Sequence, residues 1–132
     1  METRLSGHGA YRTEYHIVWI TKYRRRILNP GVKGYLRRLF LKVLNGMPGC
    51  EMVECSILED HIHMIIQLWP RESVGEVVQK LKGGTSKVIR ETHPELKEFL
   101  WGDSLWADGY FAETIGSLDE EIVKKYVRDQ RL

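Results

Sequence analysis

Hydrophobic and polar residues follow two different spacings along the chain. Segments rich in β-branched and aromatic residues are typical of strands, and they cover residues 15–22, 50–58, 61–69 and 110–115. Two other segments carry apolar residues every three or four positions, which predicts amphipathic helices, and a capping pattern predicts a third helix near the end of the chain. The elements therefore follow in the order β-α-β-β-α-β-α.

Capping residues mark the ends of the predicted helices. Asn29 caps the first helix, with Pro30 in its first turn and Gly46 at its end. Capping boxes open the other two helices, Ser73 with Glu76 and Ser117 with Glu120. The Gly-Gly-Thr-Ser run at 83–86 is expected to interrupt or bend the second helix before it resumes to Thr92. Residues 94–109 are expected to form a loop, and the last helix to end near Gln130.

The order of the first six elements matches the split βαβ, or ferredoxin-like, arrangement. Only Glu59 and Asp60 separate the second and third strands, so these strands form an antiparallel hairpin. We therefore expect an α+β fold: a ferredoxin-like or RRM-like antiparallel sheet with two helices on one face, and an extra C-terminal helix. The second face of the sheet is then free for a ligand or partner, as in RNA-recognition folds.

Length and composition are those of an ordinary globular domain. The chain has 132 residues, of which 42% are hydrophobic and 29% charged, and it is expected to form a single domain over residues 1–132. No apolar run has the length of a membrane span, and the polar N-terminus lacks the apolar stretch of a signal peptide. Two cysteines, Cys50 and Cys55, provide no disulfide framework. A cytoplasmic protein without a membrane partner is the expectation.

The net charge of +2 conceals an uneven distribution of charge. Residues 1–49 contain ten Lys and Arg and two acidic residues, a balance of +8, whereas residues 50–132 contain ten and sixteen, a balance of −6. A basic first third indicates a polyanionic partner, of which nucleic acid is the commonest. A solvated charged face explains the same pattern and, on charge alone, is the more frequent cause.

Two histidines lie one residue apart in the apolar segment EDHIHMIIQL, residues 59–68. Because alternate residues of a strand share a face, one side of this strand is a uniform core face made of Ile62, Met64, Ile66 and Leu68. The other side carries His61, His63, Ile65 and Gln67. The Cβ atoms of the two histidines are then about 6.5–7 Å apart, so both imidazoles can reach one ion. The pair predicts a metal site, with a structural role as the alternative.

The other candidate ligands in the sequence indicate which metal ion the two histidines would bind. A structural zinc site needs two further strong ligands, and Cys50 and Cys55 are five positions apart, which places them on opposite faces of a regular strand. A site of two cysteines and two histidines is therefore not expected. Two histidines with oxygen ligands favour a loosely held, catalytic ion such as Mg²⁺ or Mn²⁺.

The last helix contains a candidate nucleophile and a candidate oxygen ligand. Tyr126 and Gln130 are four positions apart and share one face of the helix. Lysines and arginines surround them in the sequence. A tyrosine at the edge of a helix–sheet contact and an exposed glutamine explain the same spacing, and the five other tyrosines of the chain are not excluded as nucleophiles.

Taken together, these residues resemble a known family. The DHIH sequence at 60–63 resembles the His-hydrophobe-His motif of single-tyrosine HUH endonucleases, and Tyr126 followed by Gln130 resembles their nucleophile and third metal ligand. YHIVWITKYRRRIL (15–28) and LWADGYFAETIG (105–116) resemble the first and last strands of the small transposases in that superfamily. Those transposases serve insertion sequences of the IS-two-hundred type, which move as single-stranded DNA.

The resemblance covers nearly the whole chain, from about Tyr11 to Gln130. Glu59 stands where the family often has proline, and Ala-Asp-Gly at 107–109 stands where it often has Ser-Pro-Ser. The first departure alters a turn and the second a loop, so neither touches the proposed chemistry. Both are compatible with a divergent or domesticated copy.

The resemblance implies a transposase that cleaves and rejoins single-stranded DNA. Mg²⁺ or Mn²⁺ held by His61, His63 and Gln130 would polarise the scissile phosphate. Tyr126 would attack phosphorus and form a covalent 5′-phosphotyrosine, leaving a free 3′-hydroxyl. Because the tyrosine ester keeps the energy of the phosphodiester, no ATP is needed, and the sequence has no Walker-type phosphate loop.

The resemblance also implies particular partners. These are a homodimer, in which each last helix places Tyr126 on the histidines of the other copy, and DNA hairpins near the ends of the element. Candidates for contact with the DNA backbone are Lys22, Arg24, Arg25, Arg26, Lys82 and Lys87. Tyr23 is a candidate for stacking on an extruded base, with a partly buried turn residue as the alternative.

Other functions fit the same residues. A rolling-circle replication initiator shares the HUH chemistry, but Gln130 and the short chain favour transposition. A domesticated relative that processes genomic palindromes would be distinguished by its genomic context. A non-enzymatic RRM-like module would bind single-stranded nucleic acid by stacking on the open face, and it would be insensitive to Tyr126→Phe and to chelators.

Overall fold

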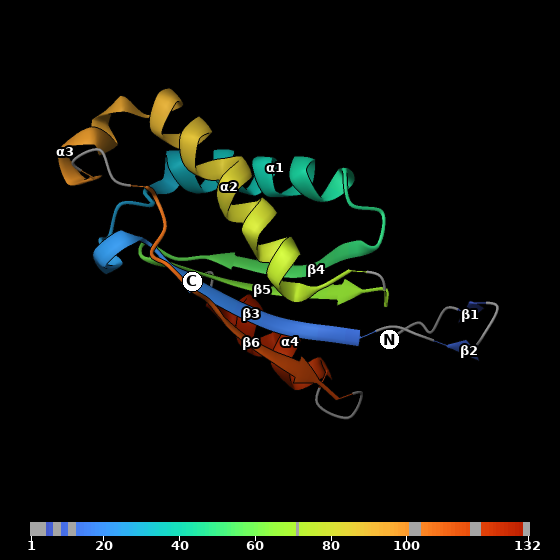
Figure 1. Cartoon of the computed structure of the whole chain (residues 1–132). Coiled ribbons are helices and arrows are strands. Elements are labelled where there is room, and N and C mark those ends of the chain that lie inside the picture. Colours follow the sequence, from blue (N-terminus) through green and yellow to red (C-terminus); the bar gives the residue numbers. More distant parts are fainter. Residues whose placement is uncertain are drawn as a thin grey trace.

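A four-stranded antiparallel sheet is the centre of the computed structural model, which describes residues 5–6, 9–10, 13–70, 72–100, 104–116 and 120–130. The strands lie in the order β4-β5-β3-β6 (Figure 1). Their bounds are Thr13–Ile20 for β3, Cys50–Ile57 for β4, His61–Leu68 for β5 and Phe111–Ile115 for β6. This order confirms the expected ferredoxin-like sheet. A separate pair is formed by β1 (Leu5–Ser6) and β2 (Gly9–Ala10).

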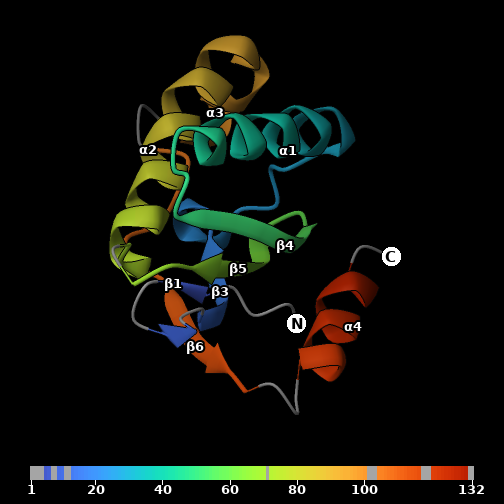
Figure 2. The same ribbon diagram turned by 90° about the vertical axis from the view of Figure 1, so that its right-hand side faces the viewer.

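The helices are divided between the two faces of the sheet. α1 (Pro30–Asn45) and α2 (Val74–Thr92) lie side by side over one face. α4 (Glu120–Asp129) lies on the opposite face, over β4 and β5 (Figure 2). The sequence led us to expect that the second face of the sheet would be free. This expectation is wrong in part, because α4 covers the face over β4 and β5. None of the helices in the described ranges is both long and apolar enough to cross a membrane.

The caps of α1 and α2 are those expected from the sequence. The Asn29 side chain accepts a hydrogen bond from the Val32 N–H at 3.0 Å, and Ser73 Oγ accepts one from the Glu76 N–H at 3.1 Å. Both bonds satisfy amide groups that lack partners in the first turn of a helix. The third predicted cap, Ser117, lies outside the described residues.

α2 is not interrupted at residues 83–86, and the expectation of a break there is wrong. Gly84 lies so close to α1 that an added Cβ would be 2.9 Å from Val43 Cγ2. The Thr85 hydroxyl donates to the Leu81 carbonyl at 2.7 Å, within the helix. At Gly84 the absence of a side chain thus allows two helices to approach, so this glycine serves tertiary packing.

Residues 94–109 contain more than the expected loop. They form a short helical turn, η2 (Pro94–Leu96), and a short helix, α3 (Lys97–Leu100). Trp106 then bridges to Thr21 beyond the end of β3, and its indole N–H donates to Thr85 Oγ1 at 3.0 Å. This segment therefore packs onto α2 and places the following β6 at the edge of the sheet.

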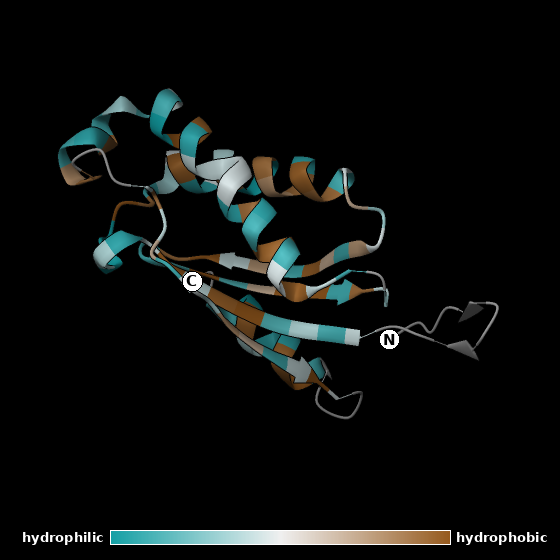
Figure 3. Ribbon diagram, in the orientation of Figure 1, coloured by the Kyte–Doolittle hydropathy of each residue, from teal (hydrophilic) through white to brown (hydrophobic). Residues whose placement is uncertain are grey.

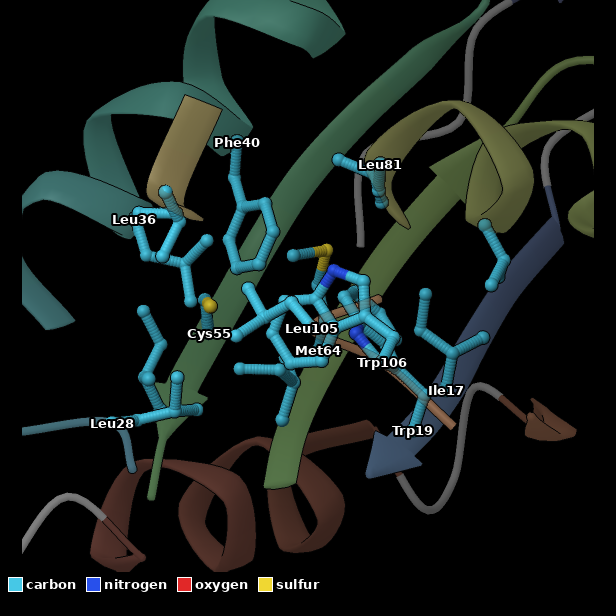
Figure 4. Packing of buried hydrophobic residues seen from close by; sticks show 14 of the residues in the cluster. Ile17, Trp19, Leu28, Leu36, Phe40, Cys55, Met64, Leu81, Leu105 and Trp106 are labelled. Atoms are coloured by element: carbon cyan, nitrogen blue, oxygen red, sulfur yellow. The ribbon is translucent and has the colours of Figure 1, made fainter. Parts of the chain in front are cut away.

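The hydrophobic core fills the space between the sheet and the pair α1 and α2. Hydrophobic and hydrophilic residues alternate along both helices (Figure 3). The Trp19 ring makes edge contacts with Phe40 and Trp106, with ring centres 5.6 and 5.8 Å apart, and Figure 4 shows these residues packed with Met64. Ile62 and Met64 belong to this core, which confirms the predicted core face of β5.

Candidate active site

His61 and His63 project from β5 on the face opposite the main core. Their Nε2 atoms face each other at 3.1 Å. His63 is buried and His61 is partly buried. The strand alternation predicted this common face, and the structure adds that the same nitrogen of each ring points to the same place.

Asp60 sets the orientation of the first histidine. Its carboxylate oxygen lies 2.6 Å from His61 Nδ1 and accepts the proton of that nitrogen, which leaves His61 Nε2 to face His63. Arg24 lies 3.4 Å from the other oxygen of Asp60. Burial raises the pKa of Asp60, but the His61 hydrogen bond and the charges of His61 and Arg24 outweigh it and hold the pKa below its ordinary value.

A third histidine, which sequence reasoning missed, contacts the second one. His16 of β3 places its Nε2 atom 3.0 Å from His63 Nδ1, and its Nδ1 atom 3.1 Å from a carboxylate oxygen of Glu113 on β6. The rings of His16 and His63 stack with centres 5.2 Å apart. The available signal was a histidine inside an apolar strand, the same signal that singled out His61.

The surroundings of His63 keep its imidazole neutral. Burial, followed by the charges of His61 and His16, lowers the pKa of His63 from 6.5 to about 4. At neutral pH the ring is therefore uncharged and carries one free lone pair. A neutral imidazole is the form that binds metal ions.

Tyr126 lies beside these histidines. Its ring centre is 5.7 Å from that of His63 and 6.4 Å from that of His16, with edge contacts to both. Tyr126 is 51% exposed, so much of the residue remains accessible to solvent. The structure thus brings Tyr126, one of the six tyrosines of the chain, next to the histidine pair of the same chain.

Contacts of α4 with β4 hold the tyrosine in this position. Val127 is entirely buried, and the Ser56 hydroxyl donates to its carbonyl oxygen. Arg128 lies 3.8 Å from a carboxylate oxygen of Glu54. One apolar contact and two polar contacts, made by the two residues that follow Tyr126, therefore hold this part of the helix against β4.

Gln130 follows α4 and lines a pocket of about 370 Å³. His61 and Asp60 line the same pocket, together with three cationic residues, Arg24, Arg26 and Lys33. Lys33 was not predicted from the sequence, since its place on α1 gives no sign that it faces this pocket. The pocket therefore joins the predicted oxygen ligand, one histidine and a group of positive charges.

The basic turn between β3 and α1 adjoins this pocket. Tyr23 is 67% exposed, so the alternative of a partly buried turn residue is wrong. Lys22 Nζ and the Arg25 guanidinium lie 5.5 and 5.4 Å from the centre of its ring. Arg26 forms an ion pair with Glu59 at 2.6 Å. Of the five predicted residues of this turn, Arg24 and Arg26 line the pocket beside His61, whereas the Arg25 guanidinium donates to the Phe99 carbonyl.

Lys82 and Lys87 are not part of this arrangement, because α2 lies on the other face of the sheet. Lys82 Nζ donates to the carbonyl oxygens of Ala107 and Gly109 at 2.6 and 3.0 Å. Burial lowers the pKa of Lys82, against the opposing charge of Asp108. Lys87 is exposed and lies 3.9 Å from Glu91. Lys82 therefore ties the loop before β6 to α2.

The cysteines do not contribute to the site, for a reason that differs from the predicted one. A bulge between Met52 and Glu54 shifts the register of β4, so that Cys50 and Cys55 pair with residues on the core side of β5. The expectation that they face opposite sides is wrong, and both are buried in the core. Within the described ranges, no group of three or more His, Cys, Asp or Glu residues is arranged to hold a metal ion.

Comparison with known proteins decides the family. Residues 9–130 match the family model described as transposase IS200 like. This chain belongs to the IS200-like transposase family. The transposase is 30% identical over 125 residues to the ISDra2 transposase TnpA of Deinococcus radiodurans, which covers 94% of this chain and 89% of that one. It is 32% identical over 129 residues to the transposase for insertion sequence element IS200 of Salmonella typhimurium, covering 94% and 80%.

Solved structures resemble this transposase in fold. The crystal structure of a candidate transposase from Deinococcus radiodurans superposes with a TM-score of 0.76 and 27% identity, over 98% of both chains. A REP-associated tyrosine transposase bound to a REP hairpin superposes with a TM-score of 0.67 and 15% identity, over 91% of this chain and 70% of that one. The second likeness concerns the fold alone. Family membership makes this protein an enzyme that acts on DNA.

Proposed function

We propose that this transposase cleaves and rejoins single-stranded DNA at insertion-sequence ends through a covalent 5′-phosphotyrosine on Tyr126. One observation carries the proposal. The Tyr126 ring lies 5.7 Å from the ring of His63, whose Nε2 atom faces that of His61 at 3.1 Å. A phenol beside two convergent nitrogen donors is the arrangement that metal-assisted attack on a phosphate requires.

The donor atoms fit Mg²⁺ or Mn²⁺. Two nitrogens bound to one ion at about 2.1 Å lie about 3 Å apart when the angle between them is near 90°, as in octahedral coordination. The Nε2 atoms of His61 and His63 show this separation. Gln130, in the pocket that His61 lines, would add an oxygen ligand. Such an ion would act as a Lewis acid toward the scissile phosphate.

The protein's own residues then carry out the transfer. Arg24, Arg26 and Lys33 would bind phosphate groups of the strand in the pocket beside His61. The Tyr126 phenol oxygen loses its proton and bonds to phosphorus, the bond from phosphorus to the 3′ oxygen breaks, and that oxygen leaves as a hydroxyl. The reverse reaction, with a 3′-hydroxyl as the attacking group, rejoins strands without ATP.

The resemblance implies a homodimer, so Tyr126 can act beside the histidines of its own chain or beside those of a second copy. Docked α4 supports attack beside the histidines of its own chain, and a dimer permits attack beside those of a second copy. Mixing two inactive variants, Tyr126→Phe and His63→Ala, separates these arrangements. Attack across a dimer restores cleavage in the mixture, because each copy supplies the part that the other lacks. Attack within one chain leaves the mixture inactive.

The first experiment is a covalent-adduct assay. The protein is mixed with labelled single-stranded DNA from its own genomic flanks and Mn²⁺, and run on a denaturing gel. We expect a protein-linked band that disappears with EDTA and in Tyr126→Phe. Tyr110→Phe is the control, because Tyr110 is similarly exposed, at 46%. A band that survives Tyr126→Phe would refute the choice of tyrosine, and metal-independent binding without a band would support a binding module.

A further inference from the structure

Polar side chains from three neighbouring strands form one line across the face of the sheet. Glu113 of β6 contacts His16 of β3 at 3.1 Å, and His16 contacts His63 of β5 at 3.0 Å. Glu113 and His16 are directly opposite each other in the β3–β6 register. The line ends at the Nε2 atom of His63, which is the atom that faces His61.

The donor and acceptor roles of the imidazole nitrogens along this line follow from their partners. A neutral imidazole has one donor and one acceptor nitrogen, and a carboxylate only accepts. His16 Nδ1 donates to Glu113, and in the neutral His16 ring Nε2 then accepts from His63 Nδ1. His63 Nε2 is then left with a lone pair and no proton. Asp60 produces the same result at His61 through a single contact at 2.6 Å.

We propose that His16 and Glu113 are positioning residues, which fix His63 in the tautomer and ring orientation that present its Nε2 lone pair to the ion site. The proposal deepens the function proposed above and rests on it for the identity of the ion. His16 is not itself a ligand, because its Nδ1 and Nε2 atoms are both engaged by Glu113 and His63. Partners of this kind hold a metal-binding histidine in one tautomer.

A structural role for His16 predicts a different outcome from a positioning role. Both its neighbours lie on strands that pair with β3, so a structural role would require only a ring of the same size. A positioning role requires an acceptor next to His63 Nδ1. His16→Phe keeps the ring and removes the acceptor, whereas His16→Gln retains an acceptor near the position of Nε2. The two variants therefore separate packing from proton placement.

The first readout is the tautomer of His63 without metal. Long-range ¹H–¹⁵N NMR correlations of the imidazole ring show which nitrogen carries the proton. We expect the proton of His63 on Nδ1 in the wild type and in His16→Gln, and a shift toward Nε2 in His16→Phe. A wild-type proton on Nε2 overturns the proposal, and so does a folded His16→Phe variant with the wild-type tautomer.

The second readout is the affinity for Mn²⁺, measured by titration followed by electron paramagnetic resonance. Loss of such a partner weakens metal binding by about 10–100-fold, and we expect this loss in His16→Phe and a much smaller one in His16→Gln. Equal affinities in the two folded variants overturn the proposal. If His16→Phe does not fold, Glu113→Ala takes its place, since the Glu113 side chain is half exposed, with Thr114→Ala on the same strand as control.

These readouts are independent of the cleavage assay. If the wild type forms no covalent adduct but shows the expected tautomers, the proposed nuclease activity is wrong and the positioning role of His16 and Glu113 stands. If the wild type forms the adduct but the folded variants keep the wild-type tautomer, the nuclease activity stands and the positioning role is wrong.

Discussion

Each histidine of the site takes its role from the partner of its Nδ1 atom. For His61 that partner is the preceding residue, Asp60, so the DHIH motif contains both the histidine and the carboxylate that orients it. For His63 the partner is His16, which lies 47 residues earlier in the chain, and the Glu113 carboxylate that His16 contacts lies 97 residues after His16. The first contact joins neighbours in the sequence, whereas only the order of the strands brings His63, His16 and Glu113 together.

The buried thiol of Cys50 makes the stability of the protein depend on pH. Burial, followed by the negative charges of Glu72 and Glu51, raises the pKa of its thiol from 9.0 to about 12. The folded protein keeps this proton at a pH where the unfolded chain has lost it. Stability from this group is therefore complete below pH 9 and declines as pH rises toward 12, by at most about 1.4 kcal/mol per pH unit.

Urea denaturation at pH 8, 9 and 10 checks this expectation. The difference in unfolding free energy between the wild type and Cys50→Ala is expected to shrink as pH rises, because the variant lacks the titrating thiol. Other groups that ionise in this range cancel in the difference. A constant difference across the three pH values would contradict the assignment.

Among the elements, α1 and α2 depend on a close approach at Gly84. A Cβ at Gly84 would lie 2.9 Å from Val43 Cγ2, whereas one at Gly83 meets nothing within 4 Å. Gly83→Ala is expected to stabilise the protein by up to about 1 kcal/mol through helix propensity. Gly84→Ala gains the same propensity but forces the two helices apart, at a cost of about 1–3 kcal/mol.

Thermal and urea denaturation of the two variants measure this contrast. Gly84→Ala is expected to be the less stable of the two, and Val43→Ala in the same chain to restore much of the loss. Equal stabilities would show that α1 and α2 tolerate the added methyl group.

The position of α4 depends on Val127. This side chain is entirely buried, whereas Ile122 on the same helix is 70% exposed. Val127→Ala removes the equivalent of two buried methylene groups, roughly 1.5 kcal/mol, and is expected to increase local opening of α4. Hydrogen exchange of the α4 amides measures this local opening. Ile122→Ala is the control, and it is expected to change stability by less than about 0.5 kcal/mol. Similar exchange in both variants would contradict the docking of α4.

For the whole molecule, part of the uneven charge along the chain gathers in one pocket, where the carboxylates of Glu59 and Asp60 face the cations. Arg24, Arg26 and Lys33 line the pocket beside His61, and all three come from the basic first third of the sequence. Charge counting alone favoured a solvated face. The fold places these three cations in the pocket that His61 and Gln130 also line, and under the proposed function a DNA strand that reaches Tyr126 would pass there.

Salt dependence tests this placement. Arg26→Ala is expected to weaken single-stranded DNA binding and to reduce the slope of log affinity against log salt by about 0.7, the value for one phosphate contact. Fluorescence anisotropy at several NaCl concentrations measures the slope. Lys42→Ala, an exposed residue on α1, is the control. A slope that changes equally in both variants would indicate a diffuse charge effect.

The sequence by itself determined the order of the elements, the caps at Asn29 and Ser73, the core face of β5 and the convergence of His61 and His63 on one side. These features depend on residues a few positions apart, whose spacing sets their direction. Only the tertiary structure decided that His16 and Glu113 continue the line from His63, that a bulge turns both cysteines into the core, and that Gly84 lies inside a continuous helix. Each of these depends on the alignment of strands or helices distant in sequence, which local spacing does not specify.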